Sequence, residues 1–538
     1  MGRERYILSP DQRVGERYEL FVRHGTTMAA PVVTCTCRTC SKARVTLERI
    51  FNVLDTYGWL LDSYVVNNEI DLEIRRIALQ DFFQERLWEK LPSSWRSTLQ
   101  TVSPDEFGEW LAGDISCSRA WPLSLLALRQ VARNLQLNRD HRNDESAWRC
   151  DGGKKFECSS ENSVLENKNK GLSDTPAALS KHNNLFLKHV KIKKRHEIQQ
   201  IARICADCAR ESNAKCIVDV GAGVGHLARS LAFKYGLNVT CIEQDALLSQ
   251  QARKWDNELL MTLSKHLPDL PVNTPQHVSI KLENINSDRS ATIRDIRRIF
   301  SHNFNSGEKK SRFGIVGLHP CGDLAATLLK FYASQSEARF ICIVGCCYMK
   351  LTLESPANIP NGYPLSKYLS SFGKRKLSYT ALEVACHAIE SYRDKLKTGN
   401  YEDLIVHAYR AALETILIKR NSQLRHTQVR NVKVTRPVTF EQYCTAATAD
   451  FEPNLRPEDS DFQNPQIKSY LNQWRQIVIF GALRTMLAPL VETVVLLDRF
   501  LYLSENDLFP VLKPIFDPRL SPRNFLLFSM KNVEQSPC

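Results

Sequence analysis

The chain lacks the two features that would direct it into or across a membrane. It begins Met-Gly-Arg-Glu-Arg and has no signal-peptide pattern of a basic region, an apolar stretch and small residues. Its longest apolar segment, residues 477–503, is interrupted by Arg484, Glu492, Asp498 and Arg499, and such charges are costly in lipid. We therefore expect a buried core helix there, no membrane partner, and a protein of the cytoplasm or nucleus. The 17 cysteines are then expected to be reduced thiols rather than disulfides.

Acidic residues are in short supply relative to basic ones. The 538 residues include 72 Lys and Arg against 59 Asp and Glu, which gives a formal net charge of +13. This excess favours an anionic partner such as RNA, and general solvation of the surface is the alternative. With 43% hydrophobic and 24% charged residues, the chain has the composition of an ordinary globular protein long enough for more than one domain.

The organisation along the chain follows from changes in the local pattern. Residues 1–45 are predicted to be disordered. Apolar residues recur at helical intervals through residues 46–138, which are predicted to form a helical N-terminal domain. Residues 139–180 are rich in Asn, Asp, Ser, Lys and Gly and poor in apolar residues, which indicates a disordered linker. Residues 181–532 form the predicted α/β domain, with an insertion at about 419–470.

Three cysteines near the N-terminus have the close spacing of half a zinc site. They are Cys35, Cys37 and Cys40, and structural zinc takes four such ligands. His24 is the only close candidate for a fourth ligand. The sequence therefore predicts no metal site, and whether these cysteines bind metal stays open at this point.

Strands and helices alternate in the second domain, which is the pattern of a parallel sheet covered by helices. Short runs rich in Val and Ile suit strands that are buried on both faces. Strands are predicted at residues 216–220, 238–243, 277–282, 313–318 and 340–344, with closing strands at residues 500–503 and 525–530. Helices are predicted at residues 227–235, 246–263, 324–334 and 476–497.

A glycine-rich turn follows the first of these strands. Asp219, Gly221, Gly223 and Gly225 alternate with other residues, and glycine permits backbone angles and close ligand approach that a Cβ would forbid. The dinucleotide spacing needs its third glycine one position later, where His226 stands, and no Walker A lysine follows. The turn instead resembles motif I of class I methyltransferases. In that family the loop packs against the methionine and ribose parts of S-adenosylmethionine, with the acid near the methionine end.

An acidic residue ends the second predicted strand. Glu243 stands 22 residues beyond Gly221, where the carboxylate of a Rossmann-like fold accepts hydrogen bonds from both ribose hydroxyls. An ordinary acid at a strand end is the alternative, and the glycine turn in a βαβ context favours cofactor binding. Gln244 and Asp245 are predicted to reach the ribose or adenine edge. Asn284, after the third strand, is a weaker adenine candidate.

Several separated segments resemble the methyltransferase-like protein 25 family. The resemblance is strongest to its B-type members, whose other name refers to a ribosomal RNA adenine dimethylase domain. The segments lie at residues 87–95, 121–128, 193–197, 317–324, 344–351, 497–499 and 516–524, and the resemblance covers roughly residues 46–532 apart from the linker and loops. It implies an α/β fold, a class I methyltransferase Rossmann-like sheet preceded by a helical N-terminal domain, with S-adenosylmethionine as cofactor.

The adenine dimethylation that this name implies is poorly supported by the residues at the expected acceptor site. Adenine-N6 methyltransferases resemble one another in an Asn/Asp-Pro-Pro-Tyr-like motif after strand four, which holds the exocyclic amine. Residues 319–323 of this chain read His-Pro-Cys-Gly-Asp at that place. Residues 358–361, Asn-Ile-Pro-Asn, follow strand five, which is the wrong position on the sheet.

The candidate catalytic residues follow the fourth and fifth strands, whose ends border the reactive methyl group in this topology. His319 and Asp323 are predicted to orient or deprotonate the acceptor. The alternative is that His319 caps the strand end and Asp323 caps the following helix.

Cysteines form a second set of candidates. Cys321, Cys346 and Cys347 lie at the two strand ends where cytosine-C5 RNA methyltransferases carry a nucleophile and a second cysteine, but the flanking residues differ. The His-x-Cys-Gly and Cys-Cys motifs are more similar to the transfer-RNA 2′-O-methyltransferase family of the Trm-thirteen type. Buried cysteines lining a tight site are the alternative that we favour. Tyr348 is predicted to stack on a base or to close the pocket.

Basic residues supply the remaining predictions. Lys194, His196 and Glu197 stand where the chain enters the α/β domain, a segment that covers the cofactor in related folds, and a solvated basic run followed by a helix start is the alternative. Residues 419–436 have no acid between Glu414 and Glu441 and suit phosphate contacts without base stacking, or form a solvated insertion. The sequence therefore predicts a methyltransferase whose acceptor is RNA. A protein methyltransferase and a non-catalytic module that kept the cofactor fold are the alternatives.

Overall fold

The structure, a computed structural model, describes residues 35–61, 80–113, 119–143, 146–152, 189–214, 216–266, 272–280, 312–353, 362–373, 377–399, 401–432 and 437–531. All of these belong to one compact unit, residues 35–538. The strands are β1 (Trp148–Arg149), β2 (Cys216–Val220), β3 (Asn238–Glu243), β4 (Gln276–Ser279), β5 (Phe313–Leu318), β6 (Ala338–Val344), β7 (Val511–Pro514) and β8 (Phe525–Met530).

The helices fall into three groups along the chain. Before the sheet come α1 (Arg38–Tyr57), α2 (Ser93–Leu99), α3 (Pro104–Ala112) and α4 (Leu123–Leu135). Among the parallel strands lie α7 (Ile192–Glu211), α8 (His226–Arg229), α9 (Ala246–His266) and α11 (Asp323–Ser334). After β6 come α12 (Lys367–Ser370), α13 (Tyr379–Val384), α14 (Ile389–Lys397), α15 (Glu402–Arg420), α16 (Phe440–Ala447), α17 (Asp459–Gln463), α18 (Pro465–Asn472) and α19 (Trp474–Ser504).

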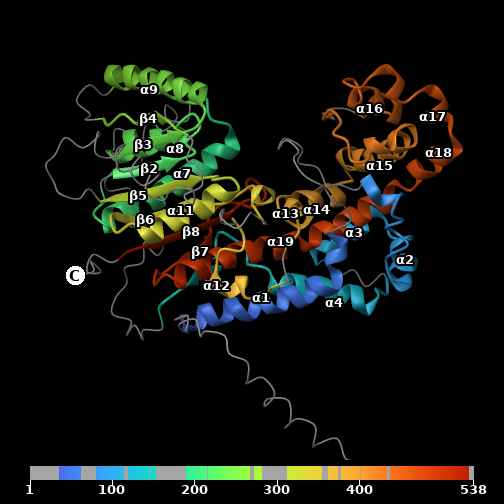
Figure 1. Cartoon of the computed structure of the whole chain (residues 1–538), viewed down its shortest axis with the longest axis horizontal. Helices are drawn as coiled ribbons and strands as arrows, with labels where there is room; N and C mark the ends of the chain where they lie inside the picture. The colour runs from blue at the N-terminus through green and yellow to red at the C-terminus, as the bar shows by residue number, and fades with distance from the viewer. Residues whose placement is uncertain are drawn as a thin grey trace, which may run out of the picture. The chain divides into compact units, whose positions relative to one another are not determined.

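One mixed sheet contains all eight described strands. Its order is β1-β7-β8-β6-β5-β2-β3-β4. The strands from β6 to β4 are parallel, whereas β8 runs antiparallel to both β6 and β7 (Figure 1). The chain order reverses between the adjacent strands β2 and β5, which is where open α/β sheets bind their ligands. This arrangement confirms the predicted α/β, Rossmann-like fold.

The central strands are buried on both faces, as their Val and Ile content predicted. All residues of β2, β5 and β6 are buried. On one face, α7, α8 and α9 form one apolar core with the sheet; on the other, α11 and α19 form a second. The predicted strands at 216–220, 238–243, 313–318 and 525–530 are confirmed at the same bounds.

Helix α19 is the core helix that the charges in residues 477–503 predicted. By length and hydropathy its 31 residues would span a membrane, but its most apolar window is fully buried inside the chain. Two of these charges are tolerated because they have buried partners: Arg484 donates to the carbonyls of Leu60 and Leu61, and Glu492 pairs with Arg523. The helix continues to Ser504, so the strand predicted at 500–503 is wrong, and β7 takes its place beside β8.

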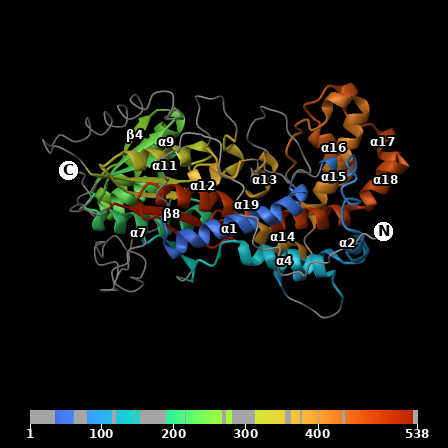
Figure 2. The same cartoon turned by 60° about the horizontal axis from the view of Figure 1, so that its bottom comes forward.

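The predicted boundaries of the N-terminal part need correction. Helix α1 begins at Arg38, inside the segment predicted to be disordered. Helices α1 and α4 pack against α19 (Figure 2), and so does α3. Arg139 pairs with Glu390 and Glu492, and β1 joins the sheet, so the linker does not begin at residue 139. The local composition could not show this, because these contacts come from segments hundreds of residues away. Residues 1–34 and 153–180 lie outside the described part of the chain.

The described residues of the predicted insertion, 419–470, pack with the preceding helix around a small apolar core. Helices α15, α16 and α18 contribute to that core, and α15 lies almost entirely before residue 419. The arginines of residues 419–436 are engaged by acids: Arg420 with Asp461, Arg425 with Asp81 at 2.9 Å, and Arg430 with Asp450. These acids come from outside residues 419–436. The absence of acids within the segment therefore did not mean that its arginines are unpaired. Residues 433–436 lie outside the described residues.

Candidate functional site

The glycine turn connects β2 to α8 at the carboxyl edge of the sheet. Gly221, Gly223 and Gly225 have φ values of +71°, +57° and +71°, which glycine adopts without strain. The Gly221 N–H donates to the carbonyl of Ile242 on β3 at 2.8 Å. The turn is therefore tied to the neighbouring strand as well as to its own helix.

The strand-end acid closes this turn from the side of β3. Glu243 accepts a hydrogen bond from the Gly223 N–H at 2.8 Å and another from the Asp245 N–H at 3.1 Å. Asp245 in turn accepts from the Leu247 N–H at 2.8 Å and so caps α9. The sequence predicted both acids as cofactor ligands, and the structure adds that Glu243 organises the backbone of the turn itself.

Asp219 is a buried acid at the end of β2. Its Oδ2 atom is buried and accepts no hydrogen bond from the described residues. Burial raises the pKa of Asp219 to about 7, although the positive charge of Lys194 opposes this shift. A buried acceptor without a partner is costly, so this oxygen suits the amino group of a ligand.

These residues fit S-adenosylmethionine. A Cβ at Gly223 would meet no atom within 4 Å, so the turn faces open space there. Glu243 stands at the end of β3, where this fold binds the ribose hydroxyls. Asp219 offers a buried acceptor without a partner for the methionine end of the cofactor. When bound, the cofactor supplies an electrophilic methyl group.

Alanine substitutions at two glycines should separate stability from cofactor binding. At Gly225 a Cβ would lie 2.9 Å from His277 Cε1, and its φ is left-handed, so we expect Gly225→Ala to destabilise the fold by roughly 1–3 kcal/mol. Gly223→Ala meets only the left-handed φ and should cost about 1–2 kcal/mol, but its methyl group enters the cofactor space. Chemical denaturation and calorimetry with S-adenosylmethionine measure the two effects. Equal losses of affinity in both variants would contradict this assignment.

The other predicted cofactor residues have mixed surroundings. Gln244 is exposed at the end of β3, beside the turn. Lys194 lies in the first turn of α7, with Nζ 3.5 Å from Glu197 Oε2. His196 accepts a hydrogen bond from the Asp517 N–H at 3.0 Å, so its ring is turned to the segment before β8. Asn284 lies outside the described residues.

A cavity of about 370 Å³ opens beside the ends of β5 and β6. It is lined by Lys191, Lys193, Lys194, Glu197, His319, Cys321, Cys346, Cys347, Met349, Cys386 and Arg523. Four predicted catalytic residues, His319, Cys321, Cys346 and Cys347, therefore meet there, and α7 contributes a basic rim. Because the strands β2, β5 and β6 are parallel neighbours, the cavity opens at the same edge of the sheet as the glycine turn.

His319 and Glu197 form a dyad within this cavity. His319 Nε2 lies 3.0 Å from Glu197 Oε2, and Glu197 Oε1 accepts from the Ser521 hydroxyl at 2.7 Å. Burial opposes the ionisation of Glu197, but His319, Lys194 and Ser521 outweigh it and lower its pKa to about 2. His319 has a φ of +71°, an unfavourable conformation for histidine that marks a structurally determined position. Its N–H donates to the Val344 carbonyl at 3.1 Å.

The sequence analysis placed Glu197 only in the segment expected to cover the cofactor and gave it no catalytic role, because its partner is 122 positions away. A signal was nevertheless present. Glu197 falls on the helical face of α7 that also carries the buried residues Ile201 and Cys208, and it is itself fully buried. An acid within an apolar stripe requires a partner, since burying an unpaired charge is costly.

The three cysteines form a cluster. The Sγ atom of Cys321 lies 3.1 Å from that of Cys346 and 3.3 Å from that of Cys347. Contacts with Cys321 and Cys347, together with burial, raise the pKa of the Cys346 thiol. The hydrogen bond with Cys346 lowers the pKa of Cys321, but the contact with Cys347 and burial raise it overall. A thiol with a raised pKa is a poor nucleophile. These contacts therefore favour the interpretation in which the cysteines only line the cavity over the one in which a cysteine attacks the acceptor.

Two predicted catalytic residues have structural contacts instead. Both carboxylate oxygens of Asp323 bind Thr352, one accepting from its N–H at 2.9 Å and one from its hydroxyl at 2.6 Å. Tyr348 is 2% exposed, and its hydroxyl donates to Glu492 at 3.0 Å. The predictions that Asp323 deprotonates the acceptor and that Tyr348 stacks on a base are therefore wrong. Asp323 connects the start of α11 to the segment after β6, and Tyr348 belongs to the buried charge network around α19.

The fold and this site define an S-adenosylmethionine-dependent methyltransferase. The sheet order, the glycine turn and Glu243 have the arrangement expected of that class. Residues 193–354 match the protein family described as "Methyltransferase domain". The matched range includes α7, the glycine turn and both strand-end motifs. The chain is thus a methyltransferase, and S-adenosylmethionine is its methyl donor.

Two relatives are named "Probable methyltransferase-like protein 25". The chain is 24% identical to the protein of Mus musculus in an alignment 457 residues long, which covers 64% of this chain and 76% of that protein. It is 28% identical to the protein of Homo sapiens over 232 residues, which are 41% of this chain and 37% of that protein. These two matches confirm the predicted resemblance to methyltransferase-like protein 25. The assignment to the B-type members stays a prediction.

A solved structure also matches in part. It is the plantazolicin methyltransferase BpumL in complex with SAH, which is 12% identical, with 55% of this chain and 95% of that chain covered. The TM-score is 0.15, and no detail of the site rests on this likeness.

Proposed function

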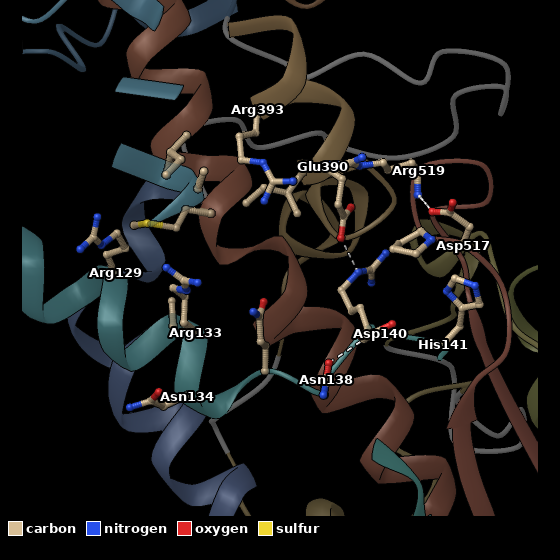
Figure 3. A pocket seen from close by; sticks show the side chains of 18 of the residues that line it. Arg129, Arg133, Asn134, Asn138, Asp140, His141, Glu390, Arg393, Asp517 and Arg519 are labelled. Atoms are coloured by element: carbon tan, nitrogen blue, oxygen red, sulfur yellow. Dashed lines mark hydrogen bonds and ion pairs between the residues drawn. The ribbon is translucent and has the colours of Figure 1, made fainter. Parts of the chain in front are cut away.

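We propose that this methyltransferase modifies RNA. The observation that supports the proposal is a pocket of about 990 Å³ between α4, α14 and the segment before β8, in which most of the charged lining residues are arginines (Figure 3). Its acids are Asp140, Glu390 and Asp517. Its arginines are twice as numerous: Arg129, Arg133, Arg139, Arg142, Arg393 and Arg519. A concave surface with this charge suits the phosphates of a nucleic acid.

The exposed arginines of this pocket are available for phosphate. Arg133 is exposed and has no acidic partner among the described residues. Arg142 pairs with Asp140, but its side chain is 80% exposed. Exposed ion pairs contribute little stability, so a phosphate can compete for Arg142.

The arginine pocket is close to the cavity of His319. The segment from Asp517 to Arg523 lines both, and it binds α7 through His196 and Ser521. A strand held by the arginines would therefore pass the basic rim of the cavity. This continuity supports RNA over a protein acceptor, because only the former carries a phosphate at every residue.

We assign the role of proton acceptor to His319. The ionised Glu197 carboxylate favours the tautomer with hydrogen on Nε2, which leaves Nδ1 as the acceptor. Glu197 is then a positioning residue that holds the imidazole, and Ser521 holds Glu197. A base held near the acceptor atom removes its proton as the methyl group is transferred.

Labelled methyl transfer tests the acceptor class. The full chain is incubated with S-adenosylmethionine carrying a labelled methyl group and with total RNA or total protein from cells that lack the enzyme. We expect the labelled product to be destroyed by ribonuclease and to resist protease. A product that resists ribonuclease and is removed by protease would show a protein acceptor. No labelled product in either fraction, from protein that binds the cofactor, would favour a non-catalytic module.

Substitution of the exposed arginines tests the binding surface. Arg133→Ala and Arg142→Ala should each weaken RNA binding and lower the slope of log affinity against log salt by about 1, because each removes one phosphate contact. Arg475→Ala is the matched control, since Arg475 is exposed but lies outside the pocket. Fluorescence anisotropy over a salt series measures the slopes. Equal slopes in all three variants would contradict the assigned surface.

A further inference from the structure

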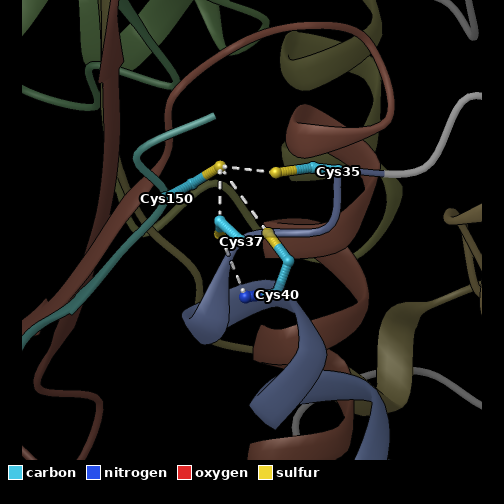
Figure 4. A group of neighbouring side chains, drawn as sticks. All are labelled: Cys35, Cys37, Cys40 and Cys150. Atoms are coloured by element: carbon cyan, nitrogen blue, oxygen red, sulfur yellow. Dashed lines mark hydrogen bonds between the residues drawn. The ribbon is translucent and has the colours of Figure 1, made fainter. Parts of the chain in front are cut away.

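Four cysteines from distant parts of the chain meet at the beginning of α1. Cys35, Cys37 and Cys40 are the half-site noted in the sequence, and Cys150, just after β1, completes the group (Figure 4). Cys150 is more than a hundred positions from each of the others. No pattern of local spacing could therefore have paired it with them, and His24 lies outside the described residues.

The distances suit a tetrahedral metal ion. The Sγ atoms of Cys35, Cys37 and Cys40 lie 3.7, 4.0 and 3.6 Å from Cys150 Sγ, and all four lie within 4.8 Å of one another. Zinc–sulfur bonds of about 2.3 Å place tetrahedral ligands about 3.8 Å apart. A disulfide would require a sulfur–sulfur distance of about 2.05 Å, and all four are free thiols.

The surroundings stabilise negative sulfur. The Cys40 N–H donates to Cys37 Sγ at 3.3 Å, and Cys37 is the N-cap of α1, where the helix dipole favours anions. The Ser504 hydroxyl lies 3.0 Å from Cys40 Sγ and 3.6 Å from Cys150 Sγ. Such outer donors orient the ligands of a metal site. The first turn of α1 carries no acid that would oppose thiolates.

We infer that Cys35, Cys37, Cys40 and Cys150 bind one structural zinc ion. Four protein ligands leave no open position for a substrate, which distinguishes a structural from a catalytic zinc site. The ion would connect the start of α1 to the segment after β1, at the edge of the sheet. The last residue of α19, Ser504, contacts the same group through its hydroxyl. It would thus fix the N-terminal helix on the methyltransferase sheet independently of the methyl acceptor.

The cysteines of the cavity are a separate group. Cys321, Cys346 and Cys347 supply three ligands, and their sulfur atoms are 3.1 to 3.5 Å apart, closer than tetrahedral zinc ligands. A metal assay must distinguish the two groups, and Cys321→Ser provides that distinction.

Metal analysis of the full chain tests the inference. Protein purified without chelators is analysed by elemental mass spectrometry, and we expect one zinc per chain. Cys35→Ser and Cys150→Ser should lose this zinc, whereas Cys321→Ser and Cys444→Ser should keep it. Cys444 is a matched control because it is buried and belongs to neither cysteine group. Folded protein without metal, iron in place of zinc, or zinc lost only in Cys321→Ser would overturn the inference.

One mild variant and two measurements on the wild type keep the test decisive where another variant fails to fold. Cys35 is the least buried of the four ligands, so Cys35→Ser is the variant that disturbs the core least. Cobalt bound to the wild type in place of zinc should give the charge-transfer absorption of thiolate ligands, which requires no variant. A peptide map of unreduced wild type that shows a disulfide between Cys40 and Cys150 would overturn the site.

Discussion

Replacing Glu243 with alanine is expected to lower the affinity for S-adenosylmethionine by about a hundredfold or more. The carboxylate accepts from the Gly223 and Asp245 N–H groups, and its position at the end of β3 is that of the acid that binds ribose. Each hydrogen bond to a charged group contributes about 1.5–3 kcal/mol. Loss of two hydrogen bonds to the Glu243 carboxylate accounts for a hundredfold loss of affinity, because about 1.4 kcal/mol corresponds to a factor of ten in affinity.

Calorimetry on folded protein measures this loss. Asp245→Ala is the comparison, because it removes a carboxylate two residues away whose observed contact is the cap of α9. That variant should lose about 1 kcal/mol of stability and much less affinity than Glu243→Ala. Unchanged cofactor affinity in folded Glu243→Ala would contradict the assignment of the site, and equal losses would show that Asp245 also binds the cofactor.

Replacing His319 with alanine is expected to lower kcat by about 10²–10⁴-fold, the usual contribution of a general base, while S-adenosylmethionine still binds. The basis is the dyad at the end of β5, in which His319 lies 3.0 Å from Glu197. Glu197→Gln should reduce kcat less, because the amide can still hold the ring. If the two residues act as a unit, the double variant should be no slower than the His319 variant alone.

The ionisation of Glu197 affects stability at acidic pH and not activity near neutral pH. The pKa of Glu197 is about 2, so this carboxylate stays ionised through the range of an assay. For stability, a depressed carboxyl pKa contributes above its ordinary value of 4.5 and is lost as pH falls toward 2.

Initial rates with saturating cofactor measure kcat in each variant. Cys386→Ser is the control, since Cys386 lines the same cavity but does not contact His319 in the described structure. A His319→Ala enzyme with normal kcat would exclude the dyad from the reaction. A Glu197→Gln enzyme that is less stable but has normal kcat would limit Glu197 to a role in folding.

The features that depend on local sequence were predicted well. The strands β2, β3 and β5 were placed at their observed bounds because short runs rich in Val and Ile between turn residues favour a buried strand over a helix. The turn from Gly221 to Gly225 and the acid Glu243 belong to one βαβ unit, whose geometry is short-range. Their relation could therefore be inferred without knowing the rest of the fold.

The errors share a physical cause. Asp323, Tyr348 and the arginines of residues 419–436 looked reactive or free because their partners are distant in sequence. Residues 500–503 looked like a strand because four apolar residues suit a strand and a buried helix equally, and α19 has buried partners on all sides.

The sequence by itself determined the class of fold, the cofactor turn and the two strand ends where chemistry is expected, because each is specified by residues that are neighbours in the chain. Only the tertiary structure decided which side chains work together. Glu197 meets His319 across 122 positions, and Cys150 meets Cys40 across 110. Such pairs are brought together when the sheet and α19 bury their apolar faces, and the identity of a partner depends on that packing rather than on spacing.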